Sequence, residues 1–427
     1  MRFTVGLIAL WLLVGCGPSE DGLPHPPNVL DYPVAVTADP SGSLVWVTSG
    51  NFDLAWRGGA VLAMDVTRHD FIYDDDERPV AAQVGGMPGP VQILSREGRA
   101  DSLYVLSRTT DALYHLSLEG QSTAPILSCE GGTNDGSDSI LECPHETAIT
   151  DIIVTDTDGE ERDLTLGEDP YGLLLFRSPE LPGVDLLLTA SMGLGGTSSQ
   201  LTLFQIDDDG APIPVDSISL SGGLVSMAAH PITGRIYTSH KLINSFHVLE
   251  VQGPRSQDLN PAPQLQVVDV LSVPFQNSLG LVESHGRELA ISPDGQRLYA
   301  AFRSPASLVV VNLGEDDEGA DTDRVVGKIP LSGAPGDLLV APATGDLPEL
   351  VYVSSFGSDQ IDVVDPIHGV TVDSIPTGRG PYGMTLVEEG TNGLRRLYVS
   401  LFYDHALGVI ELNPQSPYLH SQIAEVP

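Results

Sequence analysis

Five polar and aromatic residues fall at matching positions of a repeated sequence pattern, and together they could bind and polarise a small molecule. When the repeats are aligned on their first apolar segment, Tyr171, Arg287 and Tyr382 share one position. Glu288 and Asp337 share the next. A carboxylate can act as a general base, a guanidinium can polarise an oxygen atom, and phenol groups can orient a ligand. These residue types predict a polar, aromatic-flanked pocket, provided that the fold brings the repeats together.

Two further candidates lie in the loops that lead into this position. His285 offers a second base, and Arg379 offers a second guanidinium. The candidate ligand-binding residues are therefore Tyr171, His285, Arg287, Glu288, Asp337, Arg379 and Tyr382. A purely structural interpretation is also open, in which Arg287 and Glu288 pair with one another and with Asp337 and so seal the channel.

The sequence contains no complete motif of a hydrolase or of a haem protein. It has no Gly-x-Ser-x-Gly around a serine, no His-Glu-x-x-His and no Cys-x-x-Cys-His, and its 11 histidines are scattered. We therefore assign no catalytic residue, and we expect no metal and no cofactor.

The elements that must position these residues recur with a drifting period of about fifty residues, which is typical of an array of similar β-units. Each unit has an apolar segment, a turn, and a second segment centred on a large residue. The seven centres are Trp46, Tyr104, Leu187, Tyr237, Tyr299, Tyr352 and Tyr398. The fifth unit is the clearest, because Pro-Asp-Gly at 293–295 predicts a turn between two apolar strands.

Each unit is predicted to contain four short strands. In the sixth unit these are 337–341, 350–354, 360–365 and 370–375. Their apolar residues run almost without interruption, which indicates sheets covered on both faces. Four-stranded units repeated around an axis form a β-propeller, and its inner strands share one channel mouth. The predicted fold is therefore all-β, a seven-bladed β-propeller of four-stranded antiparallel blades over residues 32–427.

The phrases at 291–300 and 350–365 carry a resemblance to a known family. They resemble the YVTN/lactonase-like seven-bladed β-propeller superfamily. The resemblance covers most of residues 32–427 and is sharpest in units five to seven. It implies the fold. For the activity, it implies only that a lactonase-like hydrolysis at the channel mouth deserves testing.

An insertion at about 128–168 interrupts the second unit. Segments 150–155 and 162–166 flank an Asp-Gly turn and predict a hairpin, which could be a protruding flap or part of an eighth blade. Cys129 and Cys143 bracket a Gly- and Asp-rich loop, and we expect them to form a disulfide. Free thiols or metal ligands are the alternatives.

The chain is strongly acidic, with 58 acidic and 20 basic residues and a net charge of −38. Such a surface repels a phosphate backbone, so we expect no nucleic-acid partner. Only Lys241 and Lys328 are lysines. Dispersed acidic residues also keep a β-protein soluble and its sheet edges apart.

The N-terminus reads as an export signal. Arg2 precedes an apolar run that ends in Leu13–Cys16, a tetrad that matches the bacterial lipobox. Residues 1–15 are then a lipoprotein signal peptide, and residues 16–31 are a lipidated Cys16 followed by a Pro-rich tether. Gly17 and Pro18 after the cysteine resemble the enterobacterial pattern for the outer membrane. We expect an exported protein that is attached to the cell envelope by lipid and carries the propeller outside the cytoplasm.

These observations favour a non-catalytic binding or scaffolding propeller at the bacterial cell envelope. Its partner would be an envelope protein or a small-molecule ligand. A lactonase-like hydrolase acting on small molecules at the channel mouth is the alternative. Ligand identity, periplasmic or surface-facing placement, and oligomeric state have no signature in the sequence.

The lipid anchor can be tested by replacing Cys16 with Ser. The variant cannot be acylated, so we expect it to move from the membrane fraction to the soluble fraction, as judged by immunoblotting of fractionated cells. A Cys129→Ser variant serves as the control that loses a cysteine but keeps the anchor. Unchanged membrane association of Cys16→Ser would contradict the prediction.

Overall fold

The computed structural model describes residues 22–427 except 75–76, 122–123, 135–139, 156–160, 194–197, 254–262, 274–283, 315–321, 346 and 390–393. The predicted signal peptide and Cys16 lie outside these residues, as does the turn of the hairpin in the insertion. In the described part of the chain, no helix is long and apolar enough to cross a membrane.

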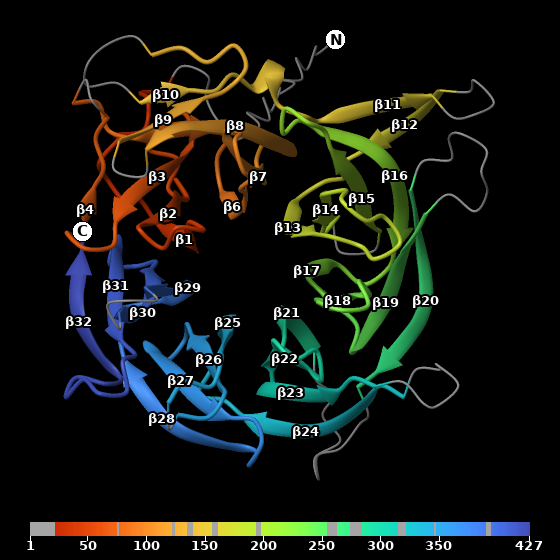
Figure 1. Ribbon diagram of the computed structural model, residues 1–427, viewed down its shortest axis with the longest axis vertical. Coiled ribbons are helices and arrows are strands. Elements are labelled where there is room, and N and C mark those ends of the chain that lie inside the picture. Colours follow the sequence, from red (N-terminus) through yellow and green to blue (C-terminus); the bar gives the residue numbers. More distant parts are fainter. Residues whose placement is uncertain are drawn as a thin grey trace, which may run out of the picture.

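Seven antiparallel sheets, blades 1 to 7, stand side by side in a ring (Figure 1). The four main strands of each blade come from one continuous stretch of chain, with the first strand nearest the centre and the fourth toward the rim. In blade 1 a short strand from the insertion of blade 2 pairs with the fourth strand. The predicted seven-bladed propeller is therefore confirmed, and the described residues form no eighth blade.

The strands fall into four sets by their place in the blade. The inner strands are β1 (Pro33–Ala38), β6 (Pro88–Leu94), β13 (Pro170–Phe176), β17 (Leu224–Ala229), β21 (Ser284–Ile291), β25 (Pro335–Ala341) and β29 (Pro381–Glu389). The second strands are β2 (Leu44–Ser49), β7 (Asp101–Ser107), β14 (Leu186–Ser191), β18 (Ile236–His240), β22 (Arg297–Ser304), β26 (Leu350–Ser355) and β30 (Leu394–Leu401). The third strands are β3 (Gly59–Asp65), β8 (Ala112–Gln121), β15 (Ser199–Ile206), β19 (Ser245–Gln252), β23 (Ala306–Asn312), β27 (Gln360–Asp365) and β31 (Ala406–Glu411). The outer strands are β5 (Ala81–Val84), β9 (Ala124–Ser128), β16 (Pro212–Leu220), β20 (Gln264–Ser272), β24 (Arg324–Pro330), β28 (Val370–Pro376) and β32 (Ser421–Val426).

The large residue at the centre of each second strand packs between neighbouring blades. All seven centres are fully or almost fully buried. In five of them a tyrosine hydroxyl also bonds to the following blade: Tyr104 to the carbonyl of Gly210 (2.7 Å), Tyr237 to Asp323 (2.7 Å), Tyr299 to Glu349 (2.7 Å), Tyr352 to His420 (3.1 Å) and Tyr398 to the carbonyl of Val66 (2.9 Å). The repeated tyrosine therefore supplies both apolar area and a directional contact between blades.

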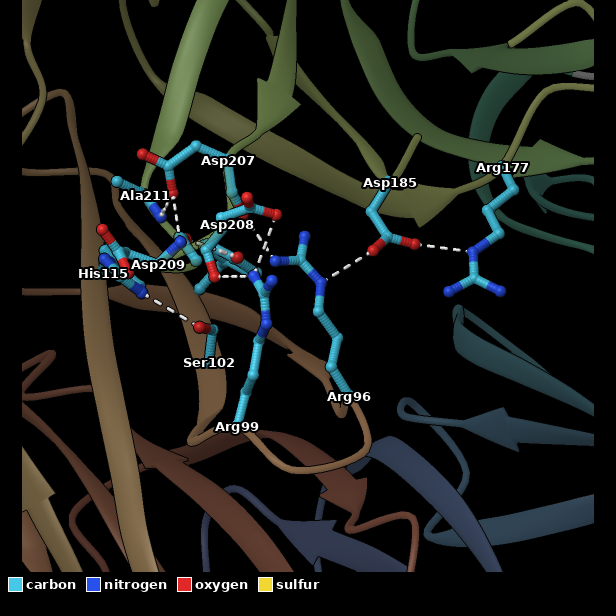
Figure 2. A network of polar contacts seen from close by, with 12 residues as sticks. Arg96, Arg99, Ser102, His115, Arg177, Asp185, Asp207, Asp208, Asp209 and Ala211 are labelled. Atoms are coloured by element: carbon cyan, nitrogen blue, oxygen red, sulfur yellow. Dashed lines mark hydrogen bonds and ion pairs between the residues drawn. The ribbon is translucent and has the colours of Figure 1, made fainter. Parts of the chain in front are cut away.

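Blades 2 and 3 are joined by an additional ionic network (Figure 2). Asp185 accepts hydrogen bonds from Arg96 of blade 2 at 2.9 Å and from Arg177 of blade 3 at 2.6 Å. Burial raises the pKa of Asp185, but the two arginines outweigh it and lower the pKa below its usual value. Arg99 contacts Asp208 at 3.0 Å. The network therefore fastens the β6–β7 loop to the next blade through charged contacts.

The ring closes between blade 7 and blade 1 without a shared sheet. The hydroxyl of Tyr398 donates to Val66, and the amide of Ala38 donates to Thr385 at 3.1 Å. Apolar side chains from both blades form one cluster, including Val45 and Val409. Side-chain packing and a few polar contacts thus hold this seam.

The segment before β1 packs onto blade 1, although the sequence suggested a tether as far as residue 31. His25 and Leu30 are each 1 % exposed. The amide of His25 donates to Gln83 at 2.8 Å, and its ring contacts Ser49 at 3.0 Å. Burial lowers the pKa of His25 to about 4, against the opposing effect of the carbonyl of Pro26. The tether expectation is therefore wrong for this part of residues 16–31.

The insertion of blade 2 forms two separate structures. Strands β11 (Asp151–Thr155) and β12 (Glu161–Thr165) pair as an antiparallel hairpin with a sheet of its own, beyond the rim of the ring (Figure 1). Nearer blade 1, the short β10 (Leu141–Glu142) of the insertion pairs in parallel with β5. Blade 1 itself contains one further short strand, β4 (Asp70–Phe71), which pairs with β3. A disulfide joins Cys129 to Cys143, ahead of a short 3₁₀ helix, η1 (His145–Thr147).

The seam can be weakened by removing one hydroxyl. Tyr398→Phe keeps the ring but leaves a buried carbonyl at Val66 without its closest donor, so we expect a loss of about 1 to 2 kcal/mol in the free energy of unfolding, measured by urea denaturation. Tyr418→Phe is the matched control, because Tyr418 is 63 % exposed. Equal stability of the two variants would contradict a role for this bond.

Candidate functional site

A β-bulge interrupts the inner strand of every blade at the same place, near the start of the strand. The pairing with the second strand shifts at Val34, at Gly89 and Pro90, at Tyr171, at Val225, at Arg287 and Glu288, at Gly336 and Asp337, and at Tyr382 and Gly383. Bulges of this kind re-aim side chains and are common beside functional sites. The position at which the sequence alignment placed the candidates is therefore a bulge, and we call it the bulge ring.

The bulge ring lines a cavity of about 550 Å³ in the channel. Tyr171, Arg287, Glu288, Asp337 and Tyr382 all lie in its wall, so the structure brings five of the seven candidates together. A cavity of this volume lies in the range of small-molecule sites.

A second ring of side chains lies in the same wall and was missed by the sequence analysis. In each blade, the inner-strand residue just before the bulge pairs with a residue of the second strand, and the residue after that partner belongs to this set. We call this set the loop ring: Gly50, Arg108, Met192, Lys241, Arg303, Phe356 and Phe402, all but the first of which line the cavity. Six of these residues directly follow the second strand and Arg303 lies near the end of β22, so their signal is a position relative to the second strand, whereas the sequence alignment uses only the first apolar segment of each unit.

Two tyrosines meet inside the ring. The hydroxyl of Tyr171 from blade 3 forms a hydrogen bond with the hydroxyl of Tyr382 from blade 7, two blades that are not neighbours. Burial raises the pKa of Tyr382, and either hydroxyl can be the donor of this bond. Arg287 donates to Tyr171 at 3.4 Å. This contact between distant blades narrows the channel and places polar groups at its middle.

Three guanidinium groups surround the tyrosine pair. Arg108 is held by Asp169 at 2.6 and 3.1 Å, and it lies 4.9 Å from the centre of the Tyr171 ring. Arg303 donates to the carbonyl of Pro335 at 2.9 Å. Burial, and next the charge of Arg287, lower the pKa of Arg303. Three positively charged side chains therefore lie in one cavity wall of an otherwise acidic protein.

Most of these cations have no carboxylate partner within the described residues. Arg108 forms an ion pair, but none is found for Arg287, Arg303 or Lys241. The Nε atom of Arg287 is buried and has no hydrogen-bond partner. Since buried charges are ordinarily paired, the unpaired cations are the most informative feature of the cavity.

The two carboxylates do not seal the channel by pairing with Arg287. Glu288 accepts a hydrogen bond from the hydroxyl of Ser226, and Asp337 accepts from the amides of Leu338 at 2.7 Å and Met384 at 2.6 Å. These contacts replace the ion pairs of the sealing interpretation, because bulged backbone and a serine hydroxyl satisfy the carboxylate oxygens.

Glu288 and Asp337 share a low-dielectric environment in adjacent blades. Burial raises the pKa of Glu288 from 4.5 to about 7, against the opposing hydrogen bond from Ser226. Burial, and next the charge of Glu288, raise the pKa of Asp337 well above its usual value. Near neutral pH the pair can therefore take up or release a proton. The described residues contain no cluster of three or more groups suited to a metal ion.

Two sequence candidates lie outside the cavity wall. His285 has a left-handed backbone with φ of 57°, and its exposed side chain contacts Ser284. Arg379 is held by Asp404 at 2.6 Å, with a further bond to the carbonyl of Tyr403 at 3.0 Å. The turn at His285 and the ion pair of Arg379 thus keep these two side chains out of the cavity wall.

The buried carboxylates should make stability depend on pH. Folded protein keeps the Glu288 proton to about pH 7, whereas the unfolded chain releases it near pH 4.5, so the free energy of unfolding falls as the pH rises between these values. Glu288→Gln removes the ionisation. Its stability relative to wild type should increase between pH 5 and pH 8 by on the order of 1 kcal/mol in urea denaturation. Glu97→Gln, on an exposed loop, is the control. Parallel pH curves for wild type and Glu288→Gln would contradict the assignment.

The comparisons with known proteins agree on the fold. No protein-family model matches the chain. A curated 6-phosphogluconolactonase from Enterobacter sp. (strain 638) is 28% identical over 121 residues, which are 27% of this chain and only 34% of that protein. The match therefore spans about a third of the relative's length.

Solved structures align over most of the chain at low identity. Sqt1 from Chaetomium thermophilum has a TM-score of 0.55 at 14% identity, covering 94% of this chain and 90% of its own. The Pseudomonas aeruginosa periplasmic gluconolactonase PpgL has a TM-score of 0.50 at 15% identity, covering 86% and 88%. At these identities the solved structures support the fold alone, a seven-bladed β-propeller.

Proposed function

We propose that the channel mouth binds a small organic anion. The supporting observation is the group of Arg287, Arg303 and Lys241, which line one cavity without a carboxylate partner in the described part of the chain. Concentrating cations in a confined space costs free energy through mutual repulsion and desolvation. A bound anion would offset that cost.

The acidic character of the whole chain makes these unpaired cations unusual. Acidic residues outnumber basic ones by 58 to 20, so acidic side chains are the commoner choice available to neutralise a guanidinium. Arg96, Arg177 and Arg235 are each paired in this way. Arg287, Arg303 and Lys241 lack such a partner within the described residues, and guanidinium groups match carboxylate and phosphate geometry.

We also propose that the propeller presents this mouth at the bacterial cell envelope, attached by a lipid on Cys16. The Leu-Val-Gly-Cys sequence at 13–16 supports the attachment. A binding module fixed to a membrane in this way would capture its ligand outside the cytoplasm.

Calorimetric titration tests the binding proposal. The probes are citrate, 6-phosphogluconate and 4-hydroxybenzoate, and we expect at least one to bind with one site per chain and more weakly at high salt. Arg303→Gln and Lys241→Gln should each weaken that binding about tenfold, because each removes a charge-assisted contact. Arg68→Gln is the control, since Arg68 is 63 % exposed and pairs with Asp65. The proposal fails if no probe binds, or if the cavity variants bind as wild type does.

Lactone hydrolysis at the same mouth is a second candidate function. Glu288 and Asp337 can hold a proton between them near neutral pH, and the similarity to 6-phosphogluconolactonase points to the same chemistry. Glu288 would take a proton from water as the water oxygen bonds to the lactone carbonyl carbon. Arg287 would stabilise the resulting oxyanion, and the ring oxygen would leave with the proton returned by Glu288.

A pH-stat assay separates hydrolysis from binding alone. With 6-phosphogluconolactone as substrate, hydrolysis predicts acid release above the spontaneous rate, and a loss of at least about a hundredfold in kcat for Glu288→Gln with anion binding retained. Glu97→Gln should keep the wild-type rate. Release by wild type no faster than in buffer would reject the enzyme and leave the binding proposal standing.

A further inference from the structure

The loop ring divides into two chemically different halves. Blades 2, 4 and 5 place Arg108, Lys241 and Arg303 at this position, whereas blades 6 and 7 place Phe356 and Phe402 there. Because the blades follow one another around the ring in chain order, the cations of blades 2 to 5 lie on one side of the mouth and the phenylalanines of blades 6 and 7 on the other. The same backbone position thus carries a charge on one side and an aromatic ring on the other.

The aromatic half continues into adjoining loops. Phe402 lies 5.0 Å from Phe52 of blade 1, 5.8 Å from Phe356 and 5.1 Å from Tyr403, measured between ring centres. All four side chains line the cavity, and Tyr403 is 48% exposed. Exposing such a cluster to water is unfavourable, and exposed apolar patches of this kind usually serve recognition.

The aromatic half is linked to the polar centre of the cavity. Phe356 contacts the Tyr382 ring edge-on, with 5.8 Å between ring centres and an angle of 84°. Tyr382 in turn bonds to Tyr171, which Arg287 contacts. A molecule lying against the phenylalanines would therefore reach the guanidinium groups through a short, continuous wall.

We infer that the ligand of this mouth is an aromatic acid, a conclusion that rests on the proposed binding of an organic anion. Its acidic group would face Arg303 and Lys241, and its ring would lie against Phe356 and Phe402. The mutually tilted rings of the cluster favour a further ring in edge-to-face contact. The cavity of about 550 Å³ has room for a molecule of this size.

A sugar acid fits the aromatic half less well. Its hydroxyl groups lose hydrogen bonds to water on binding and need replacements. Phe52, Phe356 and Phe402 have no side-chain donor or acceptor, so a polyol lying against them would leave hydroxyls unsatisfied. The aromatic half of the cavity therefore favours an aromatic acid over a sugar acid.

Titration calorimetry with matched probes tests the inference. The aromatic acids are 4-hydroxybenzoate, 4-hydroxyphenylacetate and indole-3-acetate, the non-aromatic anions are citrate and 6-phosphogluconate, and the neutral ring is 4-hydroxybenzyl alcohol. We expect an aromatic acid to bind more tightly than either non-aromatic anion and than the neutral ring. Phe356→Leu should weaken that binding about three- to tenfold by removing ring contacts, a larger loss than it causes for citrate.

The control variant is Tyr418→Leu, which removes an aromatic ring that is 63 % exposed and outside the cavity wall. Tighter binding of 6-phosphogluconate or citrate than of every aromatic acid would overturn the inference and leave the anion proposal intact. An unchanged affinity of Phe356→Leu for the aromatic acid would also overturn it. Absence of binding by every anion would instead reject the proposed function itself.

Discussion

The requirement that each sheet be covered on both faces governs this molecule. A single four-stranded blade with buried second-strand centres such as Tyr104 or Leu187 cannot stand alone in water, because its apolar side chains face both neighbours. The ring solves the problem by giving every blade two neighbours. The tyrosine hydroxyls add direction to this packing, since each reaches a fixed acceptor on the following blade. Blade spacing, and hence the shape of the channel, follows from these contacts.

Ring symmetry turns repeated positions in the sequence into a site. The bulge in each inner strand lies at the channel, so residues of different blades, such as Arg287 and Glu288 of blade 5 and Asp337 of blade 6, come to line one cavity. Most blades carry glycine, valine or proline there, which are compatible with a bulge and carry no charge. Chemistry therefore accumulates in the few blades that depart from the repeat. Arg287 and the two buried carboxylates, Glu288 and Asp337, arise in this way.

Much of the fold could be predicted from the sequence, because the second-strand centres recur and uninterrupted apolar strands indicate sheets covered on both faces. The five inner-strand candidates could be found for the same reason. Arg303 and Phe356 were missed because they lie at the end of the second strand or just after it, in a region where unit lengths differ and alignment is less obvious. His285 and Arg379 were misplaced since a left-handed turn and a local ion pair decide their direction, and neither leaves a periodic signal. The partners of Glu288 depend on contacts between blades, which no local pattern records.

The seam between blades 7 and 1 has a consequence for biosynthesis. No strand from the N-terminal blade enters the sheet that contains β32, so blade 7 is assembled entirely from the last-made residues of the ring. Until then, the nascent chain is an open arc whose two flanks, on blades 1 and 6, are apolar. Translation that stops before Pro381 would leave both flanks uncovered and prone to associate with other chains. The propeller thus becomes safe from aggregation only once its final blade has been made.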